Sequence, residues 1–402
     1  MLEVNEADIE ELRGRLDTLH EEVLREVPSE ESLPELWRFL GASVTLSALG
    51  WTALIFLMWR LNAHGASGLD SGWLLLLASG GVCALALGTF SRWIAAHHLC
   101  HRGYDRARGL PRALRSDRFG QRGWARLLWV DWMPTPAWIY EHNVRHHAYT
   151  NVPHSDPDLV EEKASWLREL KLPVPIKLLI FGIGALVWKP LYYGPNTLLE
   201  LHRHQRVMST PSTIYSWAAW SPTRAHVWRI ATLSWAPYLL IHLALPLLLV
   251  DAIFGGASVG YASLYLVASE ALTNMYSFIM IVPNHAGDDL YSFTDKSKSR
   301  GEYYMRQILS SCNYHTGRPL IDFLHGYLNY QIEHHLWPQL TMGQYRWLQP
   351  RVKGLCRELG IPYVQAPVWS RVSKLARLSV GLDHAPKLVS SPSILTQPNT
   401  PN

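Results

Sequence analysis

Residues 39–59 read FLGASVTLSALGWTALIFLMW and contain no Asp, Glu, Lys or Arg, although Arg38 and Arg60 flank them directly. As an α-helix this stretch rises about 31 Å at about 1.5 Å per residue, which matches a hydrocarbon core about 30 Å thick. The stretch therefore predicts a helix that crosses a membrane.

Two further stretches repeat this pattern. Residues 71–91 and 230–250 also lack acidic and basic side chains, and residues 260–282 are interrupted only by Glu270. We therefore expect an all-α integral membrane protein with four transmembrane helices, at about 39–59, 71–91, 230–250 and 260–282, and a helical cap outside the bilayer.

The distribution of Lys and Arg predicts the orientation. The turns at 61–70 and 251–260 contain none, whereas residues 92–229 contain 19 and the residues after 287 contain 13. By the positive-inside bias, both termini and the long middle loop are expected to be cytoplasmic. The acidic start, MLEVNEADIEELRGRL, shows no secretory signal.

The segments outside the spans complete the expected domain organisation. Residues 1–38 form a cytoplasmic N-terminal segment with an amphipathic helix, which either packs on the cap of its own chain, as we favour, or binds a partner as a coiled coil. Residues 39–382 form the membrane-bound domain. Residues 383–402 are rich in Ser, Pro and Thr and are expected to be a disordered tail. Within the middle loop, the apolar segments 124–140 and 173–188 are interpreted either as interfacial helices or as buried core of the cap.

The composition excludes several classes of protein. With 48% hydrophobic and 17% charged residues, the 402-residue chain is too apolar for two or three soluble domains. Its four cysteines form no CxxC pair, so neither a disulfide framework nor a thiolate zinc site is indicated. A net charge of +4 is too small to suggest a nucleic-acid partner.

The unusual feature is a set of 19 histidines with three dense clusters, HHLCH at 97–101, HNVRHH at 142–147 and QIEHH at 331–335. His97 and His101 are four residues apart, as are His142 and His146, so each pair is expected to share one face of a helix and to be able to chelate. The predicted topology places all three clusters on the cytoplasmic side, where His285 also emerges. Eight imidazoles are therefore expected to converge, namely His97, His101, His142, His146, His147, His285, His334 and His335.

Eight imidazoles are too many for one ion and suit two metals with open coordination positions. Imidazole binds iron, copper and zinc alike, so the ligand type leaves the metal open. The sequence IEHHL does not supply the HExxH helix of a zinc protease. A haem protein would place facing histidines within the spans, where only His242 lies, and a lone histidine there more often forms a structural hydrogen bond.

These clusters resemble the three histidine boxes of the membrane-bound fatty acid desaturases, in order and spacing, over residues 95–368. His97-x-x-x-His101 is similar to the first box, HNVRHHAYTN to the second, and QIEHHLWP to the QxxHH third box of the bacterial acyl and front-end type. His285 lies where the family places an extra ligand. The chain departs from the common pattern at Gln331, at Trp337 and in the additional His98.

The resemblance implies a non-haem centre of two iron ions held by histidine, with O2 as co-substrate, that inserts a double bond into a lipid acyl substrate. The substrate is expected to be an acyl-lipid, an acyl-CoA or an acyl group on a carrier protein. Because no HPGG haem-domain motif occurs in the sequence, electrons are expected from an external donor such as a ferredoxin with its reductase.

Four residues are candidates to support the ligands. Asp156 and Asp158 follow the second box closely and either accept a proton from a ligand ring or form a turn. Gln331 either orders a ligand or water or binds iron weakly, and Asn284 precedes His285. A further carboxylate, Glu270, is mid-span, where it is expected to meet a polar partner or the substrate tunnel.

Three alternative functions remain open from the sequence. A hydroxylase or monooxygenase on the same scaffold would need the same irons. A transporter or sensor of zinc or copper would want ionisable residues through the bilayer, whereas these histidines cluster outside the spans. A membrane scaffold with vestigial boxes is disfavoured because three boxes are intact.

Overall fold

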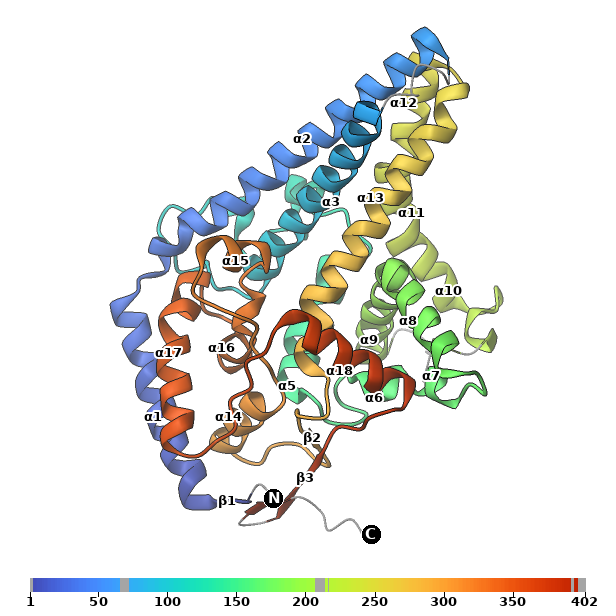
Figure 1. The fold of residues 1–402 in the computed structure, drawn as a ribbon. Coiled ribbons are helices and arrows are strands. Elements are labelled where there is room, and N and C mark those ends of the chain that lie inside the picture. The colour runs from blue at the N-terminus through green and yellow to red at the C-terminus, as the bar shows by residue number, and fades with distance from the viewer. Residues whose placement is uncertain (1–2, 66–71, 207–213, 216, 392–393, 397–402) are drawn as a thin grey trace.

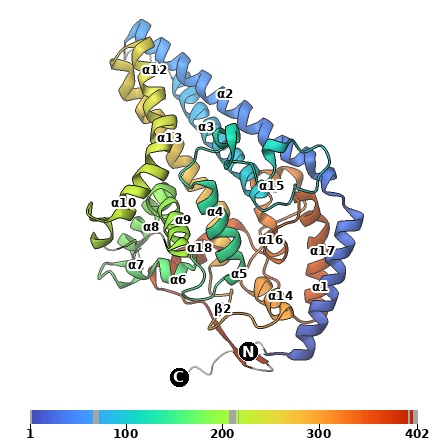
Figure 2. The same cartoon turned by 180° about the vertical axis from the view of Figure 1, so that it is seen from behind.

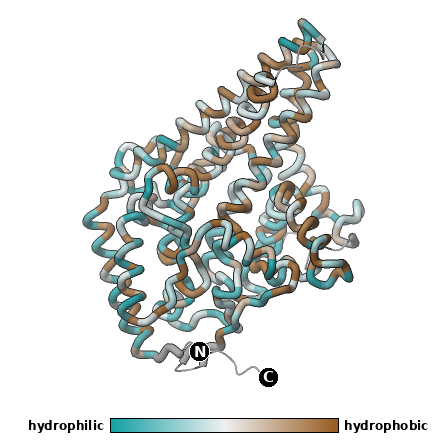
Figure 3. The backbone as a smooth tube through the Cα atoms, viewed as in Figure 1, coloured by the Kyte–Doolittle hydropathy of each residue, from teal (hydrophilic) through white to brown (hydrophobic). Residues whose placement is uncertain are grey.

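Long apolar helices rise from a cap of shorter helices in this computed structural model, which describes residues 3–65, 72–206, 214–215, 217–391 and 394–396. Figure 1 shows the helices α2 (Leu33–His64), α3 (Gly72–Cys100), α12 (Leu245–Phe254) and α13 (Ala257–Ile281) meeting at the end of the molecule opposite the cap. Apolar residues concentrate along these helices, while the cap mixes apolar and polar residues (Figure 3). The architecture is that of a helical membrane protein, as the charge-free stretches predict.

The helices α2 and α3 pack closely because small residues lie at their contact. A Cβ atom on Gly50 would lie 2.8 Å from Leu85 Cβ and 2.9 Å from the carbonyl oxygen of Gly81. Glycine at this position therefore lets the two backbones approach, as at other helix contacts in membranes.

Five continuous helices in the described residues are long and apolar enough to cross a membrane: Ser29–His64, Gly72–Cys100, Val174–Gln205, Ala225–Phe254 and Ala257–His285. Four of them contain the predicted spans, and the described part of the first outer turn ends at Gly65. The fifth contains the segment 173–188 that was interpreted as a short interfacial helix. Its α8 (Val174–Trp188) continues through a π-helical turn into α9 (Gly194–Gln205), so the apolar stretch is longer than its sequence suggests.

The other apolar segment of the middle loop, residues 124–140, is not one helix. A 3-10 helix covers Gly123–Leu128, an irregular stretch follows, and α4 (Thr135–Trp138) begins only after Pro134. The segment is interrupted because a helix generally ends at or before the residue preceding a proline. Trp129, Trp132 and Trp138 are buried, which supports the alternative interpretation of this segment as core of the cap rather than an interfacial helix.

The cap also holds the N-terminal segment. The predicted amphipathic helix is α1 (Glu6–Glu26), which buries Leu12, Leu16 and Val23 against α14 (Arg300–Leu309) and α17 (Met342–Glu358). Tyr304 donates a hydrogen bond to Asp17 at 2.9 Å. The helix therefore packs on its own chain, as favoured from the sequence.

Both termini lie at the far end of the cap (Figures 1 and 2). There the strand order is β1 (Glu3–Asn5), β4 (Ile394–Thr396), β3 (Lys387–Ser391), β2 (Ser292–Phe293). The segment expected to be a disordered tail, 383–402, is thus partly β-structure, and residues 392–393 and 397–402 lie outside the described residues. The four cysteines are all free, and three of them are buried, as expected from their spacing.

Short helices connect these parts. They are α5 (His147–Tyr149), α6 (Val160–Lys163), α7 (Ser165–Glu169), α10 (Ala225–Ile230), α11 (Ala236–Leu239), α15 (Pro319–Leu324), α16 (Gln331–Leu336) and α18 (Val368–Val380).

Candidate metal centre

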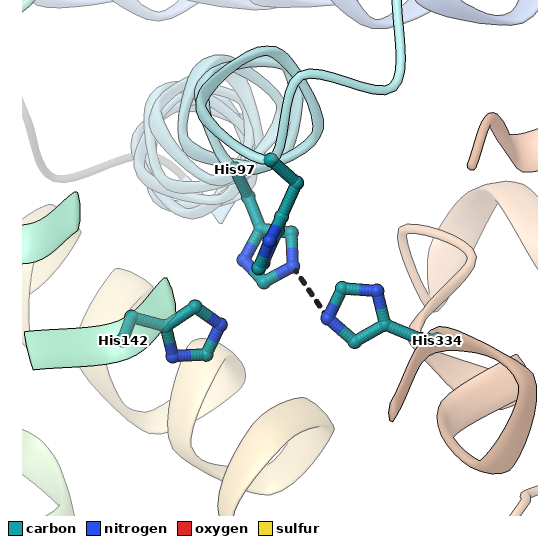
Figure 4. Close-up of side chains that lie close together, drawn as sticks. His97, His142 and His334 are labelled. Carbon is teal, nitrogen blue, oxygen red and sulfur yellow. Dashed lines mark hydrogen bonds between the residues drawn. The ribbon is translucent and has the colours of Figure 1, made fainter. Parts of the chain in front are cut away.

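The first histidine group joins the end of α3, the second box and α16. His97, His101, His142 and His334 are buried, and each offers one ring nitrogen that lies within 4.8 Å of the others. The Nε2 atoms of His97 and His334 are 3.2 Å apart. Figure 4 shows the rings of His97, His142 and His334 pointing toward one another from three separate segments.

The second group consists of His146, His285 and His335, whose ring nitrogens also lie within 4.8 Å of one another. The ring centroids of His285 and His335 are 4.3 Å apart, and that of His146 is 5.0 Å from His285. Gln331 joins this group, since its Nε2 lies 2.7 Å from the Nε2 of His285. A side-chain amide therefore contacts one ring of this group directly.

His147 lies between the two groups. Its ring centroid is 4.7 Å from that of His101 and 4.2 Å from that of His335. Its Nε2 is 3.3 Å from the Nε2 of His142. The structure thus gathers all eight predicted imidazoles into one continuous cluster.

The second box has a backbone that its spacing did not predict. Residues Ile139–His146 form a π-helix, in which hydrogen bonds join residues five apart. His142 therefore meets His147, and His146 turns to the other group. The rings of His142 and His146 do share a face, with centroids 5.3 Å apart, but their nitrogens fall in different groups, so chelation of one ion by this pair stays a prediction.

Burial keeps these rings neutral. It lowers the pKa values of His101, His142, His147, His334 and His335 well below the ordinary value, and neighbouring imidazoles lower them further. Neutral imidazoles have a free lone pair, which metal binding requires.

His146 is the exception because it has a carboxylate partner. Burial acts to lower the pKa of His146, but the interaction with Asp156 raises it, and the overall pKa lies above the ordinary value. Nδ1 of His146 is 2.9 Å from Oδ1 of Asp156. For Asp156, burial acts to raise the pKa, and the contact with His146 lowers it overall. Asp156 also accepts hydrogen bonds from the backbone N–H groups of Asn151 and Asp158, so it both closes a turn and orients a ring.

Two other rings have neutral partners. Nδ1 of His334 lies 3.1 Å from the hydroxyl of Tyr345. Nδ1 of His335 lies 2.9 Å from Oε1 of Gln307, which also accepts from Thr150. No sequence spacing pointed to Tyr345 or Gln307, because they lie outside the boxes, whereas Thr150 belongs to the second box itself.

The remaining predicted residues have structural contacts. Asp158 accepts a hydrogen bond from Tyr192 at 2.9 Å, and Asn284 donates to the carbonyl groups of Met280 and Leu328. Nε2 of His98 bonds to the carbonyl of Gly326 at 3.0 Å, and His98 belongs to neither histidine group.

Both polar residues singled out within the spans also have partners. Glu270 accepts from Trp132, Tyr238 and Asn274. His242 bonds to the carbonyl of Val130 at 2.8 Å, as expected for a lone structural histidine.

Sequence reasoning missed the carboxyl group of Glu141. It is fully buried, and it forms a third cluster with His142 and Asp158. Burial and the neighbouring Asp158 raise the pKa of Glu141 well above its ordinary value. Its position directly before His142 was the available signal.

The donor set fits a metal centre. Six rings have a buried nitrogen without a hydrogen-bond partner in the described residues, namely His97 Nδ1, His101 Nε2, His142 Nδ1, His147 Nδ1, His285 Nδ1 and His335 Nε2. Buried polar atoms are normally satisfied, so this many unpartnered nitrogens within one cluster of rings indicate a ligand. Nitrogen donors with few carboxylates suit a transition metal rather than Mg²⁺ or Ca²⁺.

A cavity of about 460 Å³ reaches this centre. It is lined by His97, His142, His146 and His285, and otherwise mainly by apolar and aromatic side chains of α8 and of residues 160–167 and 191–193. A volume of this size lies within the usual range of about 300–1,000 Å³ for ligand sites.

A helical membrane fold with two converging histidine groups defines a class of membrane metalloprotein. The chain belongs to the fatty acid desaturase family, whose sequence model matches residues 71–367. This confirms the resemblance drawn from the histidine boxes.

Three curated relatives illustrate the similarity. An acyl-lipid (7-3)-desaturase of Rebecca salina is 30% identical, over 62% of this chain and 54% of the relative. An NADPH-dependent stearoyl-CoA 9-desaturase of Mycobacterium tuberculosis is 23% identical, over 94% of this chain and 81% of the relative. An acyl-lipid (8-3)-desaturase of Physcomitrium patens is 25% identical, over 58% of this chain and 47% of the relative. The match thus spans only about half the length of two of these relatives.

Proposed function

We propose that this chain is an oxygen-dependent diiron desaturase that introduces a double bond into a long acyl chain. The observation that carries the proposal is the meeting of two histidine groups beside an apolar cavity. Relatives named for acyl-lipid and stearoyl-CoA substrates support the choice of an acyl chain.

The eight imidazoles are the proposed ligands. His97, His101, His142 and His334 would hold one iron, and His146, His285 and His335 would hold the other. His147, whose ring lies near both His101 and His335, would be available to either. Two iron ions, when bound, supply the oxidation chemistry by which O2 removes two hydrogens from neighbouring methylene groups. Gln331 and Asp156 orient His285 and His146.

The cavity positions the acyl chain. Its apolar lining excludes water and holds one carbon–carbon bond beside the histidines, which gives the proximity that an unactivated C–H bond requires. Lys163 is the Lys or Arg side chain among the described residues that line the cavity. Its positive charge favours a substrate whose head group is negatively charged.

The contact between His146 and His285 supports four membrane crossings, and the absence of Lys and Arg from residues 61–70 and 251–260 supports a cytoplasmic site. His285 lies beside His146, so an even number of the three apolar helices between them crosses the bilayer. We assign the crossings to Ala225–Phe254 and Ala257–His285. The helix Val174–Gln205 is left out because it contains two lysines, Lys177 and Lys189, which are buried in contact with the rest of the protein.

The test is expression in a host of known lipid profile, followed by mass spectrometry of double-bond positions. A desaturase gives a product lighter than its substrate by two hydrogens and dependent on O2 and an electron donor. A product heavier by one oxygen atom would instead establish a hydroxylase. Absence of any lipid change with active donor systems would contradict both.

A further inference from the structure

A large open hollow on the cap lies away from the cavity that is proposed to hold the acyl chain, here called the acyl cavity. It has a volume of about 990 Å³ and is bordered by α15, α17 and the segment 361–368. The hollow, here called the cationic groove, is lined by Arg318, Lys353, Arg357, Gln349, Tyr363 and Gln365 among others. None of its lining residues lines the acyl cavity, so both can be occupied together.

The groove has an unbalanced positive charge. Arg318, Lys353 and Arg357 are exposed and form no ion pair within the described residues, and no carboxylate is among the groove's lining residues. A second open hollow, of about 680 Å³, is lined by Arg102 and Arg115 but also by Asp105 and Asp117. The cationic groove is therefore the hollow that electrostatically favours an acidic surface.

The floor of the groove connects to the metal-binding helix. The hydroxyl of Tyr363 donates to Oε1 of Glu333 at 2.8 Å, and Asn313 donates to Oε2 of the same carboxylate at 2.8 Å. Glu333 is buried in α16 and directly precedes His334 and His335. A partner bound in the groove is therefore connected to both histidine groups by a path of a few hydrogen bonds and covalent bonds.

We infer that the cationic groove is the docking surface for an acidic one-electron carrier protein that reduces the metal centre. The inference rests on the proposed function. Converting –CH2–CH2– and O2 into –CH=CH– and two waters requires two electrons and two protons from outside the substrate. Each carrier is oxidised by one electron, so two carriers dock in turn during one turnover.

The experiment compares Lys353→Glu/Arg357→Glu with wild type, using full-length protein and an acidic [2Fe–2S] ferredoxin. Both side chains are exposed on α17, so the variant is expected to fold normally. At low ionic strength the Kd and KM for ferredoxin should rise about tenfold or more, and the difference should shrink at high salt. The KM for the lipid and single-turnover product formed with a chemical reductant should stay unchanged.

Lys171→Glu is the matched control, because Lys171 is exposed and lies outside the groove. An unchanged ferredoxin Kd in the double variant, or an equal loss in the control, would overturn the docking surface. The docking surface would also be overturned if the double variant lost affinity for anionic lipid vesicles but bound ferredoxin as wild type does. That result would identify the groove as a binding site for lipid head groups. A third outcome is that the double variant binds ferredoxin more weakly than wild type, but wild type forms no product with the chemical reductant. This outcome would contradict the desaturase function and leave the docking surface standing.

Discussion

Asp156 holds His146 by a 2.9 Å contact between Oδ1 and Nδ1, which leaves the other ring nitrogen of His146 to face His285 and His335. The carboxylate is itself fixed by two backbone N–H groups. A ring that is held in this way keeps its tautomer and orientation when a metal binds.

Replacing Asp156 by Asn should therefore weaken metal binding. We expect a loss of about 10- to 100-fold in iron affinity, the usual effect of removing such a partner. Iron competition with a chelator measures it. Asp158→Asn is the control, because Asp158 contacts Tyr192 rather than a ligand ring. Equal losses in both variants would contradict the specific role of Asp156.

Each histidine group should hold its own ion. His334→Ala and His335→Ala remove one donor from different groups, so each variant should keep about one of two irons and lose nearly all activity. Elemental analysis of purified protein gives the stoichiometry. His154→Ala should behave as wild type, since His154 is exposed and lies outside both groups. Active wild-type protein with stoichiometric zinc and no dependence on iron would refute the diiron centre.

Gly184 should influence which acyl chains are accepted. It lines the acyl cavity, and a Cβ there would meet no atom within 4 Å. Gly184→Phe should therefore fill part of the cavity and reduce turnover of the longest substrates about tenfold or more, while shorter chains are less affected. Gly182→Phe is the matched control, since Gly182 has equal space but does not line the cavity. Identical product profiles in the two variants would exclude this role.

The orientation can be tested by labelling cysteines in intact cells. A Cys83→Ser background removes the exposed native thiol. Ser67→Cys, in the first outer turn, should react with an impermeant reagent, whereas Ser297→Cys, in the cap, should react only after permeabilisation. The reverse pattern would invert the topology.

The sequence by itself determined the class of fold and the family. Charge-free stretches of 21 residues require a membrane environment, and the three boxes carry the resemblance that the family match confirms. It also identified all eight imidazoles, because histidines this dense have few structural explanations.

Only the tertiary structure decided how those imidazoles are divided. His334 and His335 are neighbours in sequence but join different groups, because successive residues of a helix point about 100° apart. His142 and His146 also join different groups, although their rings stack with centroids 5.3 Å apart. Spacing fixes a side chain's direction only relative to its own helix axis, whereas the partner of each ring depends on how α3, α16, the end of α13 and residues 139–149 pack. For the same reason Tyr345 and Gln307 could not be found as neighbours of the site before the fold was known, whereas Glu141 directly precedes His142 in the sequence.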